Sequence, residues 1–172
     1  NTNGDRTMTS IIKVDTLQTA AGAAPTAADL GINVTGTVLQ VVSGSTSSGT
    51  SNSSTNTYAD MGLSLSITPT SSTSKILVIT SQAGNTVGDP DKVSVRLMRN
   101  TTELYACMQQ VTTGLSTNDH RAITYDISYV DSPSTTSSVT YKPQFRKEAS
   151  GGRLDVQKDG NNGHITLMEI AG

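Results

Sequence analysis

The stretch ITYDISY, Ile123 to Tyr129, decides the fold class of this 172-residue chain. Apolar side chains stand at every second position, and threonine, aspartate and serine separate them. That period of two is typical of a β-strand with one buried face and one face in water. The segment Val139 to Arg146 repeats the pattern. We therefore expect two neighbouring strands of one antiparallel sheet, joined by the serine-rich turn around Pro133.

The same period runs through most of the chain after Gly36. Apolar and polar residues alternate in Leu63 to Thr68 and in Val93 to Met98. Two further segments, Leu39 to Val42 and Ile76 to Ile79, are almost continuously apolar, which predicts strands that are covered on both faces. One of the two covers would be a second sheet or a neighbouring subunit.

About nine candidate strands follow at short spacing, with Gly, Asn, Asp, Ser or Pro in the gaps and no helical period, which is typical of an all-β protein. The sequence therefore predicts a jelly-roll-like antiparallel β-sandwich. The last strand, Ile165 to Ile170, is expected near the centre of a sheet. The longest loop is expected at Ser43 to Thr57, where serine and threonine dominate. Other exposed loops are expected at Gly84 to Lys92, Thr112 to Arg121 and Lys147 to Gly152.

The N-terminal segment, residues 1–35, differs from the rest of the chain. It contains one short alternating element, followed by small residues that supply too little apolar surface to offset the entropy of ordering. We interpret it as an extended docking arm in front of a β-sandwich head domain, residues 36–172. Ile12, Val14 and Leu17 are the candidate docking residues, because an extended strand adds to a neighbouring sheet and places alternate side chains in pockets.

Composition limits the number of domains and the classes of partner. A chain of 172 residues holds one medium domain and an appendage. Only 34% of its residues are hydrophobic and 3% aromatic, so we expect a homo-oligomer that buries further surface between subunits. The sequence contains 12 Lys and Arg and 14 Asp and Glu. Because positive charge is not in excess, we expect no nucleic-acid partner. No apolar stretch approaches the ~18 residues of a spanning helix, so we expect no membrane insertion.

No arrangement of residues in the sequence is typical of a nucleophile or a metal site. Cys107 lies in the alternating run LYACMQQV and is expected to be a small buried hydrophobic residue, because a nucleophilic thiol needs a positioned base. His120 follows Asp119 in a polar segment, a pair that occurs in hydrolytic and metal sites. No further ligands stand near it at the spacing of a metal site.

A calcium site and a glycosidase site are the remaining alternatives. Asp89 and Asp91 flank a proline and could offer oxygens to Ca²⁺, but two carboxylates are also common in surface turns. A glycosidase needs only two acids, and the scarcity of aromatic residues argues against a sugar cleft. We expect no catalytic residues, no metal and no cofactor, and a protein that is not an enzyme; a glycan-degrading enzyme is the remote alternative.

Three segments carry a resemblance to a protein family. SIIKVDTLQTAAGAAPTAADLGINVTGTVLQVV (Ser10 to Val42), SPSTTSSVTYKPQFR (Ser132 to Arg146) and ITLMEIAG (Ile165 to Gly172) resemble small virion structural proteins of tailed phages that infect marine cyanobacteria and similar aquatic bacteria. The resemblance covers most of the chain after Met8 and is weakest from Gly84 to Asn118. Family members are tail-fibre-like or decoration proteins, so the resemblance implies a place on the surface of a phage particle. It brings no catalytic or binding motif with it.

The resemblance implies a particle component with a β-rich head and does not imply which part of the particle it forms. Such appendages are commonly trimers that bury one sheet face of each subunit around the axis, so we expect a trimeric fibre or spike protein. Leu39, Val41, Leu77 and Ile79 are then the candidate subunit-interface residues. The arm would bind other virion proteins, and the head would attach to a host surface glycan or protein. The alternative is a capsid decoration or connector protein that stabilises the particle without binding a host. Adhesion predicts exposed Tyr or Asn and Asp clusters far from the arm, whereas decoration predicts a broad apolar underside.

Overall fold

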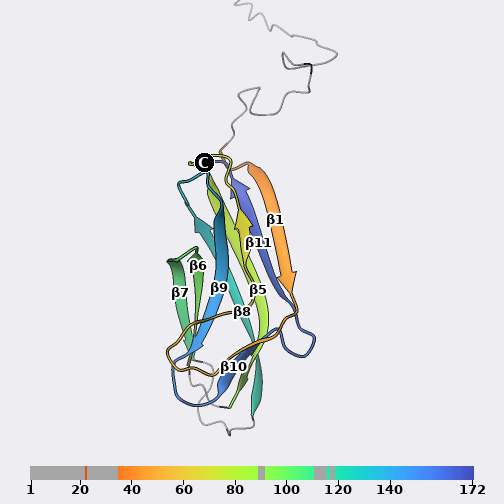
Figure 1. Cartoon of the computed structure of the whole chain (residues 1–172), viewed down its shortest axis with the longest axis vertical. Coiled ribbons are helices and arrows are strands. Elements are labelled where there is room, and N and C mark those ends of the chain that lie inside the picture. Colours follow the sequence, from red (N-terminus) through yellow and green to blue (C-terminus); the bar gives the residue numbers. More distant parts are fainter. Residues whose placement is uncertain (1–21, 23–34, 89–91, 111–115, 117–118) are drawn as a thin grey trace, which may run out of the picture. The chain divides into compact units, whose positions relative to one another are not determined.

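The computed structural model of the chain describes residues 22, 35–88, 92–110, 116 and 119–172. The chain divides into two units, Asn1–Val34 and Thr35–Gly172. The described part of the second unit contains strands and no helix, and its strands form two antiparallel sheets (Figure 1). The prediction of an all-β antiparallel sandwich is confirmed. The predicted arm, with Ile12, Val14 and Leu17, lies outside the described residues, so its extent and its docking role stay predictions.

Six strands form the first sheet, which we name sheet A, and five form sheet B. Sheet A contains β1 (Val38–Thr46), β2 (Thr50–Asn52), β5 (Lys75–Val87), β8 (His120–Asp131), β10 (Arg153–Val156) and β11 (Gly163–Ile170). Sheet B contains β3 (Ala59–Asp60), β4 (Leu65–Ile67), β6 (Lys92–Arg99), β7 (Thr102–Gln110) and β9 (Val139–Lys147).

The order of the strands is that of a jelly roll. In sheet A, β1 pairs with β11, β11 with β5, and β5 with β8; β2 and β10 continue β1 and β11 along the same edge of β5. In sheet B, β3 and β4 pair with β9, β9 with β6, and β6 with β7. The chain crosses between the sheets repeatedly, so sequence neighbours seldom pair, as in two interlocked Greek keys. The last strand lies between β1 and β5, which confirms its predicted central place.

The predicted pairing of the two strongest strand patterns is wrong. β8 pairs with β5 in sheet A, whereas β9 pairs with β6 in sheet B. The segment between them, residues 132–138, crosses from one sheet to the other. The predicted inward faces are correct, since Tyr125 and Phe145 are buried and their ring centroids lie 6.2 Å apart. A period of two reports which side of a strand is buried, and it does not report which strand lies beside it.

Several predicted loops are shorter than expected. β1 continues through Thr46 because Ser43 to Thr46 pair with β11, and β2 ends at the buried Asn52. The Asn52 side-chain amide donates 2.9 Å hydrogen bonds to the carbonyl oxygens of Thr57 and Phe145. The ladder uses backbone groups, so a serine-rich run can extend a strand when a partner lies beside it. Likewise, β5 runs to Val87, β8 begins at His120 and β9 includes Lys147.

The inward side of β5 changes character along its length. Ile76 and Val78 belong to a hydrophobic cluster that includes Leu97, Tyr141 and Leu167. Farther along the strand, three fully buried polar side chains replace them: Thr80, Gln82 and Thr86. A second hydrophobic cluster packs beside this polar stretch and is built on Tyr125, Phe145, Leu154 and Val156, with Met61, Val93 and Val95. The sandwich thus has two apolar cores and a polar stretch on its longest strand.

Candidate functional site

A continuous row of apolar residues crosses four strands on the outer face of sheet A. Val41 of β1 lies opposite Met168 of β11, Met168 opposite Leu77 of β5, and Leu77 opposite Val130 of β8. Directly opposed residues share one face of a sheet. Val41 and Val130 expose 54% and 52% of their surface, although their size and character favour burial. We name these four residues the apolar band.

The predicted interface residues lie on or beside this band. Val41 and Leu77 belong to it, and Ile79 is exposed on the same face two positions along β5. Leu39 is exposed at the start of β1, where the register with β11 shifts between Val38 and Gln40. The structure therefore brings three of the four predicted residues together on one face and places Leu39 beside them. Their role as a subunit interface stays a prediction.

Two members of the apolar band were missed in the sequence. Met168 follows Leu167, and Val130 follows Tyr129, so each pair interrupts the alternation of its strand. The same signal, two adjacent apolar residues in a strand, had singled out the segments around Val41 and Leu77. The continuous apolar run is four residues long at Ile76 to Ile79 and two residues long in β8 and in β11. It could have been found by asking which outward positions of the alternating strands are apolar.

The apolar character is confined to one end of sheet A. One row farther along, Ile79 is flanked by Thr166 and Ser128, and in the next row Ser81 is flanked by His164 and Asp126. The apolar end is the one at which β1 starts and β11 ends, so it lies next to Gly36 and to the C-terminus (Figure 1). The band is thus a local patch at the end of the head that joins the N-terminal segment. Patches of this kind commonly mark contacts with other proteins.

A buried carboxylate anchors β1 beside the apolar band. Glu169, which is fully buried, accepts hydrogen bonds from Gln40 Nε2 (2.5 Å) and from the backbone N and hydroxyl of Thr70 (2.7 Å each). Burial works to raise the pKa of Glu169, but the hydrogen bonds from Gln40 and Thr70 help to outweigh it and hold the pKa below its usual value. The ionised carboxylate therefore ties the edge strand to β11 and to the segment before β5.

An ion pair with a buried carboxylate connects the two sheets. Arg99 Nη1 of β6 lies 2.8 and 2.7 Å from the two carboxylate oxygens of Asp131, at the end of β8. The Tyr141 hydroxyl donates a 2.7 Å hydrogen bond to the same carboxylate. Burial and the neighbouring Asp131 raise the pKa of Tyr141, so the phenol stays protonated and remains a donor. All three groups are satisfied by one another, which makes this cluster structural.

The outer face of sheet B has the opposite chemistry. Asp60, Gln144 and Arg96 lie directly opposite one another on β3, β9 and β6. Gln144 Nε2 donates to Asp60 Oδ1 (2.5 Å), and Arg96 Nε donates to Gln144 Oε1 (2.7 Å). We name these three residues the polar row. Ion pairs extend it at both ends, from Lys142 to Asp60 (3.1 Å) and from Arg96 to Glu103 (2.9 Å).

An aromatic ring and a second arginine lie beside the polar row. The Cζ atoms of Arg96 and Arg146 are 3.9 and 4.6 Å from the ring centroid of Tyr58, within the range of a cation–π contact. Arg146 Nε also donates to Glu148 Oε1 at 2.9 Å, and the Ser94 hydroxyl donates to the same oxygen. Burial works to raise the pKa of Glu148, but the hydrogen bonds from Ser94 and Arg146 outweigh it and lower the pKa.

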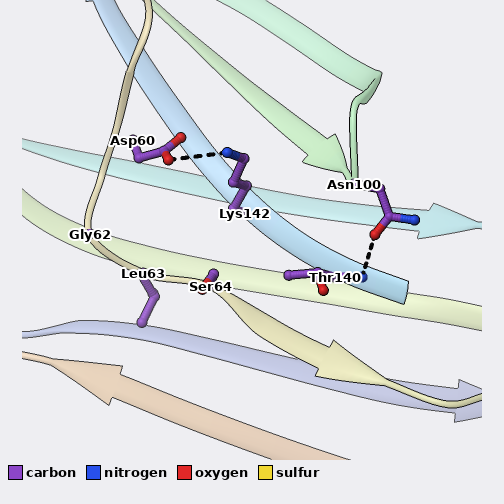
Figure 2. A pocket seen from close by; sticks show the side chains of 7 residues that line it. All are labelled: Asp60, Gly62, Leu63, Ser64, Asn100, Thr140 and Lys142. Atoms are coloured by element: carbon purple, nitrogen blue, oxygen red, sulfur yellow. Dashed lines mark hydrogen bonds and ion pairs between the residues drawn. The ribbon is translucent and has the colours of Figure 1, made fainter. Parts of the chain in front are cut away.

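Two hollows of nearly equal size lie at the two ends of the polar row. The first, of about 560 Å³, is lined by Asp60, Lys142, Asn100 and the backbone turn at Gly62 (Figure 2). In Figure 2 the Lys142 ammonium points to the Asp60 carboxylate, and Asn100 Oδ1 accepts a 2.9 Å bond from the Thr140 backbone N. The second, of about 570 Å³, is lined by Tyr58, Arg96, Arg146, Ala106, Met108 and the two glutamates Glu103 and Glu148.

The other residues considered from the sequence carry no visible site. Cys107 is only half-buried and packs against the second hydrophobic cluster. His120 is exposed at the start of β8, and Asp119 Oδ2 accepts a 2.9 Å hydrogen bond from Ser116 N. Asp89 and Asp91 lie outside the described residues. In the part of the chain that the structure describes, no group of three or more His, Cys, Asp or Glu is placed to hold a metal ion. No helix among those residues is long and apolar enough to cross a membrane.

Comparison with known proteins adds little. No family model matches the sequence, and no curated protein matches it. Eiger TNF from S. frugiperda has a similar structure, with 14% identity over 55% of this chain and 59% of that chain and a TM-score of 0.35. A chain in the structure of infectious bursal disease virus Gx strain is also similar, with 11% identity over 77% of this chain and 37% of that chain and a TM-score of 0.33. This chain thus spans well under two thirds of each matched chain. The similarities are too low to support an argument, and the resemblance to phage virion proteins stays a prediction.

Proposed function

We propose that this protein is a structural component of a phage virion, a homotrimeric fibre or spike protein that docks through its N-terminal arm and displays the β-sandwich head for host attachment. The observation that carries the proposal is the apolar band on sheet A. Four apolar side chains are aligned on a single outer face, where Val41 and Val130 are exposed and Leu77 and Met168 are half-buried. Only 34% of the residues are hydrophobic, and burial of these side chains between copies would add apolar contacts to those of the core.

The energetics favour burial of the band. Full burial of a Val, Leu or Met side chain is worth about 1.5–3 kcal/mol relative to exposure in water. The band contributes several such side chains from each subunit, and a closed ring buries the same face of every copy. β1 and β8 flank this part of sheet A, and the band crosses from one to the other. A neighbouring subunit can therefore pack on the face without displacing a strand.

The position of the band fits an arm that docks at the same end of the head. Gly36 N donates a 2.8 Å hydrogen bond to the Ala171 carbonyl oxygen, and Ala171 N donates one to the Thr37 carbonyl oxygen. These bonds fix the first residues of the head beside the apolar end of sheet A. We place Ile12, Val14 and Leu17 on a neighbouring virion protein, where the alternating segment would add to a sheet edge. The surface of a phage particle is the proposed location.

A capsid decoration or connector protein is the second candidate, and the same band favours it. In that case the apolar band would be the underside that contacts the shell, and no host would be bound. The two candidates differ for the isolated protein, because a band that joins copies gives an oligomer and a band that binds the shell leaves a monomer. Neither candidate assigns a catalytic residue or a cofactor.

Two experiments on particles test the proposal. A cryo-EM map that places the chain on the tail or collar as a trimer would support a fibre or spike, and a single layer of chains on the capsid would support decoration. Deletion of Met8 to Ala24 should leave the head folded, by circular dichroism, and abolish incorporation into particles. Incorporation at the wild-type level without this segment would contradict the docking role of the arm.

A further inference from the structure

The charged network on the outer face of sheet B has no evident role in stability. Its ion pairs are partly exposed to water, and exposed pairs of this kind stabilise a fold very little. The inward sides of β6 and β9 already bury the residues that hold sheet B in place, among them Val93, Leu97 and Phe145. A surface that orders so many polar side chains without a large gain in stability is a candidate for recognition of a ligand.

We propose that this face binds an extended polysaccharide of the bacterial cell surface, which lies across both hollows and over the polar row between them. The inference rests on the host-attachment part of the proposed function and assigns its ligand class and its site. Asp60 lines the first hollow and Arg96 lines the second, and Gln144 joins them by hydrogen bonds of 2.5 and 2.7 Å. Two similar hollows on one continuous row suit a ligand that repeats along its length.

The floor and walls of the second hollow suit a sugar ring. Ala106 and Ser94 have small side chains and lie opposite or beside the arginines, so the face is hollowed there. Tyr58 lines the hollow with a ring that also contacts both guanidinium groups, and Met108 exposes 60% of its surface at the rim. Apolar surfaces of this size pack against the C–H faces of a pyranose ring, while the polar groups around them fix its orientation.

The polar groups match the hydroxyl groups of sugars. A sugar hydroxyl donates and accepts a hydrogen bond at once, and each arginine here is held beside a carboxylate or an amide oxygen. Neighbouring hydroxyls can therefore accept from a guanidinium and donate to a carboxylate of the same pair. These side chains are already fixed by one another and by the Tyr58 ring, so binding would cost little further side-chain entropy.

The charge balance and the backbone argue against two other ligands. Three cationic side chains on this face, Arg96, Lys142 and Arg146, stand beside three carboxylates, those of Asp60, Glu103 and Glu148. A nucleic acid would require an excess of positive charge. An extended peptide pairs with the free edge of a sheet, whereas β6 and β9, which carry Arg96, Gln144 and Arg146, are already paired on both sides; of the strands that line the second hollow, β7 is the edge strand.

The test uses the full-length protein on an array of purified bacterial O-antigens and capsular polysaccharides, followed by titration of the strongest binder. Ala106→Trp should fill the second hollow, and Arg96→Lys should keep the charge but remove the planar fork that contacts Gln144, Glu103 and Tyr58. Thr124→Trp is the matched control, because Thr124 is exposed on the polar end of the outer face of sheet A. Thermal melting should show that all three variants fold.

We expect at least one polysaccharide to bind. Its dissociation constant should rise at least about tenfold in Ala106→Trp and in Arg96→Lys and should be unchanged in Thr124→Trp. No binding on the array would overturn the proposal, and so would binding that both sheet B variants leave intact. A monomer that binds polysaccharide would refute the trimer and leave this site in place. A trimer without polysaccharide binding would refute only this site.

Discussion

The outer faces of the two sheets offer a direct comparison, because each sheet buries an equivalent inward face. Sheet A exposes Val41 and Val130 at the ends of the apolar band. Sheet B exposes Asp60 at one end of the polar row and Glu103, which pairs with Arg96, beyond the other end. Core packing dictates neither choice, since these side chains point away from the core. The difference teaches that the outward positions vary independently of the core; we propose that those of sheet A meet a protein surface and those of sheet B meet water and a polar ligand.

The largest effect is expected for a substitution in the apolar band, measured as dissociation of the proposed trimer. Leu77→Glu places a charge in the middle of the band, and a buried, unpaired charge is strongly unfavourable. We expect the dissociation constant of the trimer to rise about 100-fold or more, measured by sedimentation velocity. Ser81→Glu is the matched control on the same strand and face, four residues farther along, and should leave the trimer intact. Equal dissociation of both variants would show that the band has no special role.

The next effect is on the fold that supports both faces. Asp131 follows Val130 of the band and ties β8 to Arg99 of sheet B. Loss of one partner from a buried ion pair lowers the free energy of unfolding by about 3–5 kcal/mol. Because Arg99 is partly exposed, we expect Asp131→Ala to lower it by an amount at the low end of this range. Urea unfolding should show this loss. A loss below ~1 kcal/mol would mean that the pair does not hold the sheets together.

A pH titration compares a carboxylate on the buried side of sheet A with one on the outer face of sheet B. The pKa of Glu169, beside the band, and that of Asp60, in the polar row, are both lowered by hydrogen bonds that outweigh burial. A lowered pKa in the fold stabilises it above the ordinary carboxyl pKa, and this stability is lost as the pH falls through the folded value. Because only Glu169 is fully buried, Glu169→Gln should flatten the acid dependence of unfolding more than Asp60→Asn does. The reverse order would contradict the assigned burial and hydrogen bonds.

The smallest effect concerns the stability of the sheet B face. Tyr58→Leu removes the ring that contacts Arg96 and Arg146. A partly exposed cation–π contact is worth about 0.5–1 kcal/mol, so thermal unfolding should change by only a few degrees. Polysaccharide binding should fall much more than stability does. A large loss of stability would instead give this face a structural role.

Much of the fold could be predicted from the sequence, because burial has a local signal. The alternation around Tyr125, Val95 and Tyr141 identified the inward sides of β8, β6 and β9, and the structure buries all three residues or nearly so. The pairing of β8 with β5 could not be predicted from this alternation, because the topology of the whole sandwich determines which strands are hydrogen-bonded to each other. The loop predicted at the serine-rich end of β1 is wrong for the same reason, because Ser43 to Thr46 pair with β11.

The candidate sites were predictable to different degrees. Half of the apolar band was found because Val41 and Leu77 lie in continuous apolar runs, and such runs are visible without a structure. The polar row was missed because its members are distant in sequence: Asp60 and Gln144 are 84 positions apart, and Arg96 and Gln144 are 48 apart. Asp, Gln and Arg at separate outward positions are typical of any solvated strand, and only the strand register makes them neighbours.

The central claim is that copies of this chain bury the apolar band against one another, and native mass spectrometry of the full-length wild-type protein tests it most directly. We expect a species of three times the chain mass of 17.9 kDa at micromolar concentration. Sedimentation of the same sample should give the matching trimer. A wild-type protein that stays monomeric, with the amides of β1 and β8 beside Val41 and Val130 open to solvent by hydrogen exchange, would contradict it.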